Sequence, residues 1–205
     1  RDLRMSRGLG DVYKRQISNR ILTESPLRTY YTGDDGEFIY KNTYSLPIGY
    51  MTYNDPYGWE GSEAIGSGID NQNSLIKNLT GISNVFTLTY ENSTDAGFEV
   101  KPVKAGHLYM ITKNTACDTV TVTIRGSEYT YKDLKKGGTI LDLGYATPED
   151  VIVVSADTSM NASVYTLETS RFTEAFNILN NNSLNVSEFT KNKIKGTVNA
   201  DKDAT

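Results

Sequence analysis

Residues 118–126, DTVTVTIRG, contain the clearest strand pattern of this 205-residue chain. Threonine alternates with valine and isoleucine, so an extended backbone would place the polar side chains on one face and the apolar side chains on the other. Branched β-carbons also favour extended backbone. The stretch therefore predicts a β-strand with one buried and one solvent-exposed face.

Seven further runs of strand length surround this stretch, and Gly, Pro, Asn or Asp separates each from the next. They cover residues 85–91, 97–103, 106–112, 127–131, 138–144, 150–157 and 162–169. Eight short strands at a spacing of about ten residues are typical of an antiparallel sandwich. We therefore predict a mainly β (α+β) fold with an antiparallel β-sandwich or jelly-roll-like domain over 85–169.

A helix is predicted on either side of the sandwich. Over about 70–81, Leu75, Ile76 and Leu79 form one apolar face, Asp70 or Asn71 can cap the start, and Gly81 can cap the end. Over about 170–181, Ser170 can cap the start, and the residues at helical spacing are Phe172, Ala175, Phe176 and Leu179. We expect both apolar faces to pack in the core.

The segment before the first helix is predicted to contain short strands. TGDDGE, residues 32–37, has the Asp-Gly chemistry of a tight turn between the strand-like runs 27–31 and 38–40. Its carboxylates could suggest calcium, but they lack the ligand spacing of an EF-hand loop. We expect a solvated hairpin tip.

Composition and charge exclude several classes of function. The formal net charge is −4, and residues 1–16 carry five Lys/Arg and two Asp, so the remaining chain has a net charge of −7. An acidic body is a poor partner for nucleic acid. The longest apolar run, Val151 to Val154, is far shorter than the roughly 18 to 20 residues that cross a bilayer.

Residues with catalytic or metal-binding chemistry are scarce. His107 is the only histidine and Cys117 the only cysteine, so neither a disulfide nor a zinc site can be assembled. No nucleophile-elbow, P-loop or zinc-protease motif is present. We expect His107 at the surface or half-buried at a strand start and Cys117 buried or half-buried in a β region. We expect no cofactor and no metal.

The best local candidate for ligand contact is the aromatic loop YMTYNDPYGWEG, residues 50–61. Aromatic rings beside polar groups can hold sugar rings by stacking and hydrogen bonding. The candidate glycan-binding residues are Tyr53, Asp55, Tyr57 and Trp59. The alternative, which the Tyr-rich composition favours, is that these rings pack against the core and fasten the loop.

Three stretches, in order along the chain, resemble the YfhO family of bacterial membrane proteins. The first is 17–51, with the motif residues Tyr40, Asn42, Leu46, Pro47 and Gly49 in YKNTYSLPIGY. The second is DNQNSLIKNLTG, with Asn71, Asn73, Leu79, Thr80 and Gly81. The third is 172–203, with Gly196 in IKGTVNAD. Together they extend over most of the chain.

The resemblance implies a polytopic GT-C-type glycosyltransferase with a large extracytoplasmic region near its C-terminus. Such proteins are associated with attaching sugars from a lipid-phosphate carrier to envelope polymers such as lipoteichoic acid. Their catalytic carboxylates lie among early transmembrane helices, so the resemblance assigns no catalytic residue here and implies that this part alone is not an enzyme. The implied location is the extracytoplasmic face of the membrane. The implied partners are an envelope glycan or polymer acceptor and the transmembrane part of the same protein.

The chain divides into four predicted parts. Residues 1–16, RDLRMSRGLGDVYKRQ, resemble translated sequencing-adapter DNA, and we expect them, with Leu9, Val12 and Tyr13, to stay outside the folded core. Residues 17–84 form a mixed strand and helix segment, and 85–169 form the sandwich. Residues 170–205 add a helix and strands that rejoin the first segment, and KDAT suggests a truncated hairpin.

Three functions remain open. The first is an extracytoplasmic accessory domain of a membrane glycosyltransferase, which positions or shields the acceptor polymer. The second is a stand-alone carbohydrate-binding or cell-surface adhesion module. The third, a self-contained hydrolase, is the least favoured because the motif chemistry is missing.

Overall fold

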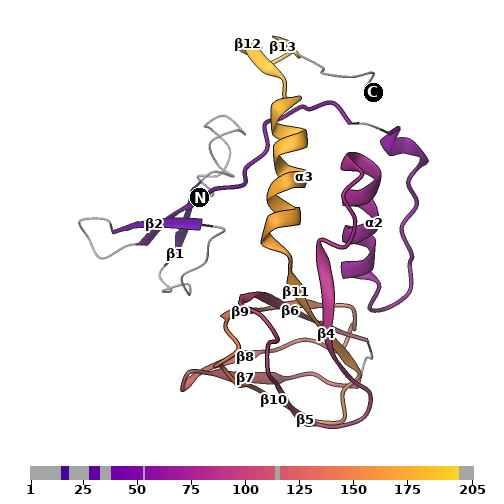
Figure 1. Cartoon of the computed structure of the whole chain (residues 1–205), viewed down its shortest axis with the longest axis vertical. Helices are drawn as coiled ribbons and strands as arrows, with labels where there is room; N and C mark the ends of the chain where they lie inside the picture. Colours follow the sequence, from indigo (N-terminus) through magenta and orange to yellow (C-terminus); the bar gives the residue numbers. More distant parts are fainter. Residues whose placement is uncertain (1–14, 19–27, 33–37, 53, 114–115, 199–205) are drawn as a thin grey trace. The chain divides into compact units, whose positions relative to one another are not determined.

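The structure is a computed structural model (Figure 1), and it describes residues 15–18, 28–32, 38–52, 54–113 and 116–198. Residues 1–14, with Leu9, Val12 and Tyr13, lie outside this range. The chain forms two compact units. One contains the described residues up to Tyr57, Asn78–Gly81 and the chain from Thr173 onward, and the other contains Gly58–Lys77 and Ile82–Phe172.

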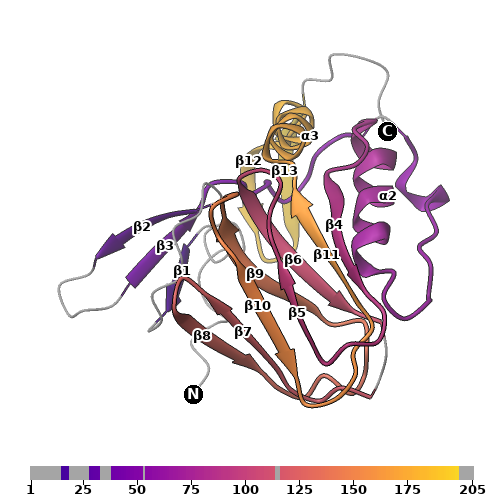
Figure 2. The same ribbon diagram turned by 60° about the horizontal axis from the view of Figure 1, so that its bottom comes forward.

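The second unit is a sandwich of two four-stranded antiparallel sheets (Figure 2). Its strands coincide with the eight predicted runs, so the predicted fold class is confirmed. They are β4 (Phe86–Asn92), β5 (Gly97–Val100), β6 (Gly106–Thr112), β7 (Val120–Ile124), β8 (Ser127–Tyr131), β9 (Ile140–Ala146), β10 (Ile152–Ala156) and β11 (Ala162–Leu167).

The strand order is that of a jelly roll. One sheet runs β4-β11-β6-β9 and the other β5-β10-β7-β8. Counted from β4, these orders are first-eighth-third-sixth and second-seventh-fourth-fifth, which is the double Greek key of that fold. Because the first and last strands are hydrogen-bonded neighbours, the chain enters and leaves the sandwich side by side.

The core lies between the two sheets and follows the alternation seen in the sequence. Val120, Val122 and Ile124 of β7 are buried, whereas Thr121 and Thr123 between them are half-exposed. Each fully buried aliphatic side chain contributes about 1.5–3 kcal/mol relative to an exposed one. The period-two pattern therefore determines which face of β7 is inside.

The outer face of the β4-β11-β6-β9 sheet is also covered. Helix α2 (Gly68–Thr80) places Ile69 against Ile111 of β6 and Tyr165 of β11. This second layer explains why β11 is buried at every position, with no alternation.

Helix α2 begins earlier than predicted. The Ser67 carbonyl accepts a hydrogen bond from the Asn71 backbone N–H, so the helix starts at Gly68 and neither Asp70 nor Asn71 is its cap. At the other end, Gly81 has φ +79°, a left-handed conformation that favours glycine. The predicted C-cap is therefore confirmed.

Helix α3 (Thr169–Asn181) confirms the second predicted helix, but Ser170 does not cap it. The Glu168 carbonyl accepts a hydrogen bond from the Phe172 backbone N–H, so Glu168 precedes the first turn. Ser170 already lies inside the helix, where a capping backbone conformation is impossible. The helix buries Ala175 and Leu179.

A three-stranded sheet lies in the other unit, in the order β1-β3-β2. Its strands are β1 (Arg15–Ser18), β2 (Arg28–Thr32) and β3 (Phe38–Asn42). β2 and β3 pair antiparallel, as the hairpin prediction requires, while the tip at 33–37 lies outside the described residues. β1 begins at Arg15, two residues before our predicted boundary at Ile17, because Arg15 and Gln16 pair with β3.

The remaining elements are short. A 3-10 turn, η2 (Pro56–Gly58), lies in the aromatic loop, and a two-stranded ribbon of β12 (Asn185–Thr190) and β13 (Lys193–Thr197) follows α3. No helix in the described ranges is long and apolar enough to cross a membrane.

Candidate functional site

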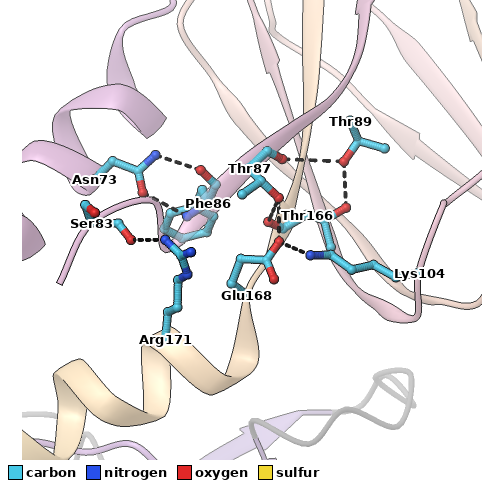
Figure 3. A network of polar contacts seen from close by, with 9 residues as sticks. All are labelled: Asn73, Ser83, Phe86, Thr87, Thr89, Lys104, Thr166, Glu168 and Arg171. Atoms are coloured by element: carbon cyan, nitrogen blue, oxygen red, sulfur yellow. Dashed lines mark hydrogen bonds and ion pairs between the residues drawn. The ribbon is translucent and has the colours of Figure 1, made fainter.

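Polar side chains gather where the chain enters and leaves the jelly roll (Figure 3), and we call this set the junction network. It draws on α2, β4, β11, the start of α3 and the loop between β5 and β6. Its members are Asn73, Ser83, Phe86, Thr87, Thr89, Lys104, Thr166, Glu168 and Arg171.

Glu168 is the charged centre of the junction network. Thr87 Oγ1 donates to its Oε1 at 2.6 Å, and Lys104 Nζ forms an ion pair with the same oxygen. The Glu168 side chain is 15% exposed. Burial alone would raise the pKa of this carboxyl, but the hydrogen bonds from Lys104 and Thr87 outweigh burial and lower the pKa. Glu168 is therefore a carboxylate held by partners from two other segments.

Asn73 holds the start of β4 through the backbone. Its Oδ1 accepts from the Phe86 N–H at 2.8 Å, and its Nδ2 donates to the Phe86 carbonyl at 2.8 Å. The side-chain amide thus satisfies both backbone groups of one residue. Asn73 ties α2 to the first strand of the jelly roll.

Further contacts join the two ends of the jelly roll. Arg171 Nη1 in α3 donates to the Ser83 carbonyl at 2.8 Å, just before β4. The hydroxyls of Thr89 and Thr166 lie 2.6 Å apart across β4 and β11. The main chain contributes a bond from the Glu168 N–H to the Val85 carbonyl at 2.8 Å. These contacts fix the first and last strands to each other and to the helices that adjoin them.

The aromatic loop is fastened to α2 at two points four residues apart, which lie on one helix face. Asn54 Nδ2 donates to the Asn78 carbonyl at 2.7 Å, and Asn78 Nδ2 reaches the Asp55 carbonyl at 3.5 Å. Trp59 Nε1 donates to Ser74 Oγ at 3.0 Å. These hydrogen bonds hold the loop against α2.

Only part of the predicted glycan site can be placed. Trp59 is half-buried and the Asp55 side chain is exposed. Tyr53 and the Tyr57 side chain lie outside the described residues. The hydrogen bond from Trp59 to Ser74 agrees with the alternative that the aromatic rings fasten the loop to the protein. Glycan binding by these residues stays a prediction.

The first family motif connects β3 to α3. Asn42 Oδ1 accepts from the Tyr44 N–H at 3.0 Å, which forms a turn at the end of β3. The Tyr44 hydroxyl lies 2.8 Å from Thr173 Oγ1, and its ring meets the Phe176 ring edge-on, with centroids 5.1 Å apart. The motif therefore has a packing role along α3.

The same motif also pairs with the chain after α3. The Gly49 carbonyl accepts from the Leu184 N–H at 2.8 Å, and Tyr50 forms an antiparallel bridge with Ser183. Leu46 and Pro47 are half-buried, and Tyr40 lies in β3, with its side chain outside the described range.

The other two motifs also make structural contacts. Asn71 accepts from the Ser62 N–H at 2.8 Å and donates to its carbonyl at 2.7 Å, which fastens the loop before α2. Leu79 is half-buried and Thr80 is buried. A Cβ at Gly196 would overlap the carbonyl oxygen of Asn185, so the ribbon requires glycine there.

The single histidine is more deeply buried than predicted. His107 is fully buried, with Nε2 2.5 Å from Asp142 Oδ1 and its ring 5.0 Å from that of Tyr109. The prediction of a surface or half-buried position was wrong, because Asp142 and the Tyr109 ring lie against the imidazole. The described residues include no group of side chains that could hold a metal ion.

Cys117 is buried beside β7, as predicted. Burial is the main cause that raises the pKa of its thiol to about 11, and the nearby Asp157 adds to the rise. A thiol in this state is a poor nucleophile.

Sequence reasoning missed the junction network. Thr87 and Glu168 are 81 residues apart, and no local motif links them. The one available signal was Asn73, which lies in the second family motif but was not assigned a partner.

Comparison with known proteins identifies the family. The family model described as "Bacterial membrane protein YfhO" matches residues 14–205. No curated protein and no solved structure matches the chain. The match extends over almost the whole sequence and includes the three motif stretches. The chain belongs to the YfhO family of bacterial membrane proteins.

Proposed function

We propose that this chain is the extracytoplasmic, non-catalytic portion of a polytopic membrane glycosyltransferase. The observation that carries the proposal is the match to a bacterial membrane protein family over residues 14–205. In this proposal the whole protein transfers a sugar from a lipid-phosphate carrier to a cell-envelope polymer such as lipoteichoic acid. The catalytic groups then belong to the membrane-embedded part.

Within that protein, the jelly roll positions or shields the acceptor polymer. Two features support this role. The jelly roll is a scaffold that lectins also use, which is an analogy of fold. The junction network fixes the ends of the jelly roll, as a rigid positioning domain requires.

The membrane side can be tested in intact cells with the full-length protein. Val103 is 87% exposed in the loop before β6, so Val103→Cys should react with a membrane-impermeant maleimide from outside. The unaltered protein, with Cys117 buried, is the matched control. Labelling of Val103→Cys only after the cells are permeabilised would place the domain inside and contradict the proposal.

The reaction can be tested in a strain that lacks its own YfhO-family protein. Supplying the full-length gene should restore sugar on lipoteichoic acid, measured by NMR of the purified polymer. Unchanged sugar content on this and other envelope polymers would contradict the glycosyltransferase assignment.

The second candidate is a carbohydrate-binding or adhesion module, favoured by the half-buried Trp59 and the exposed Asp55 in one aromatic loop. Titration of the purified chain with envelope glycans tests it. Loss of binding in Trp59→Ala and retention in Trp59→Phe would support ring stacking, and no binding by the unaltered chain would reject it.

A further inference from the structure

The β12–β13 ribbon has one apolar face. Phe189 pairs with Ile194, and Val186 pairs with Gly196 beyond the irregularity at Ser187. Directly paired residues point to the same side, and alternate residues along one strand do too. Val186, Phe189 and Ile194 therefore share a face, and they are 41%, 52% and 51% exposed.

The opposite face is charged. Glu188 and Lys195 are paired across the strands, and Glu188 Oε2 lies 3.3 Å from Lys193 Nζ and 3.4 Å from Lys195 Nζ. Lys191 lies in the turn between the strands. With three lysines and one glutamate, the ribbon is locally positive in a chain of net charge −4.

A two-stranded ribbon of this kind is marginal in water by itself. The apolar side chains of the ribbon stay about half-exposed, whereas both sheets of the jelly roll bury theirs against the shared core. Exposed apolar side chains grouped on one face are typical of a surface that is covered in use.

We propose that the β12–β13 ribbon docks on an anionic lipid surface. Val186, Phe189 and Ile194 enter the interface between headgroups and acyl chains. The ribbon is one strand layer thick, so the lysine stems can bend around it and bring their ammonium groups to the lipid phosphates.

Two observations favour lipid over a second copy of the chain. The ribbon carries more lysines than glutamates, so anionic headgroups attract it, whereas a second ribbon of the same charge offers no such attraction. The chain also belongs to a family of membrane proteins, so a lipid surface is within reach of the protein. The inference does not depend on the glycosyltransferase assignment.

Flotation of the purified 205-residue chain with vesicles tests the proposal. Phosphatidylcholine vesicles that contain phosphatidylglycerol should bind the chain at least about tenfold more tightly than pure phosphatidylcholine vesicles. Added salt should weaken this binding, because it screens the lysine–phosphate attraction. Equal binding to both vesicles, or none, would overturn the proposal.

The variants separate the ribbon from other apolar surface. Phe189→Ser and Ile194→Ser should each weaken vesicle binding severalfold, whereas the matched control Leu88→Ser, at an exposed position of β4, should not. Lys191→Gln should lower binding to anionic vesicles only. Far-UV circular dichroism checks that each variant is folded.

The same preparations also test whether a second copy of the chain, rather than lipid, covers the apolar face of the ribbon. Light scattering after gel filtration should give a monomer for the unaltered chain. A dimer that Phe189→Ser dissociates, or an equal loss of vesicle binding in Leu88→Ser, would overturn the assignment to lipid.

Discussion

At the scale of single residues, the junction of the jelly roll depends on side chains whose partners are far away in sequence. Asn73 binds the backbone of Phe86, and Glu168 binds Thr87 and Lys104. Each side chain satisfies groups that would otherwise lose hydrogen bonds when water is removed. Substitution of either side chain should therefore lower the free energy of unfolding, because its partners are left without a hydrogen bond.

Asn73→Ala should lower the free energy of unfolding by about 2 kcal/mol, because two hydrogen bonds are lost and the Phe86 backbone groups are left without partners. Urea unfolding of the purified chain measures this. The matched control is Gln72→Ala, since Gln72 is the exposed neighbour on the same helix. Equal effects of the two substitutions would show that the two hydrogen bonds between Asn73 and the Phe86 backbone do not stabilise the fold.

Glu168→Gln should lower the free energy of unfolding by about 1–2 kcal/mol at neutral pH, because charge-assisted hydrogen bonds become neutral ones. The pKa of Glu168 is lowered from 4.5 in the folded chain. Its contribution is therefore complete above pH 4.5 and is lost as the pH falls through the lower folded value. Urea unfolding at neutral pH and below pH 4.5 should show the difference between variant and wild type shrinking in acid. A difference that stays constant would exclude the ionised carboxylate as its source.

At the scale of elements, strands were easier to predict than helix starts. The eight runs of the sandwich each became a strand, because strand-forming residues and the turn residues between the runs are local signals, and in β7 the period-two pattern also matches the buried face. Both helices begin before the predicted caps. Asn71 binds the backbone of Ser62 with its side chain, and Glu168 occupies the position before α3. At α2 a tertiary contact thus occupies the Asn71 amide on which the cap prediction relied, and α3 starts too early for Ser170 to cap it.

Gly196→Ala should unpair the β12–β13 ribbon, because the added Cβ would overlap the Asn185 carbonyl and approach Leu184. Hydrogen exchange should rise in residues 185–197, while the strands of the jelly roll keep their protection. Gly58→Ala is the control, since nothing lies within 4 Å of a Cβ there. Unchanged exchange in the ribbon would contradict this reading of Gly196.

At the scale of the molecule, the jelly roll has one core between its sheets, and its two ends lie together. β4 and β11 are adjacent in one sheet, and the core is shared by both sheets. Cys117 lies in this core and is the only cysteine of the chain. The reactivity of its thiol therefore measures how often the core of the jelly roll opens to solvent.

Alkylation of Cys117 by iodoacetamide should be at least about a hundredfold slower in the folded chain than in urea, at mildly alkaline pH. Burial and a thiol pKa of about 11 both suppress the thiolate in the folded state. Mass spectrometry of the alkylated chain gives the rate. In Asn73→Ala the rate should increase in step with the loss of stability, and rapid alkylation of the folded wild type would contradict a buried thiol.

The sequence by itself determined the eight strands, the two helices, the glycine at the end of α2 and the family, because each depends on local periodicity, a turn residue or a motif in order. The buried state of His107 was not visible, since its partner Asp142 lies 35 positions away in the sequence, on another strand. Nor was the junction network, whose contacts join residues up to 81 positions apart. Only the tertiary structure decided these features, because the order of strands in space, which places β4 beside β11, brings the two ends of the jelly roll into hydrogen-bonding distance.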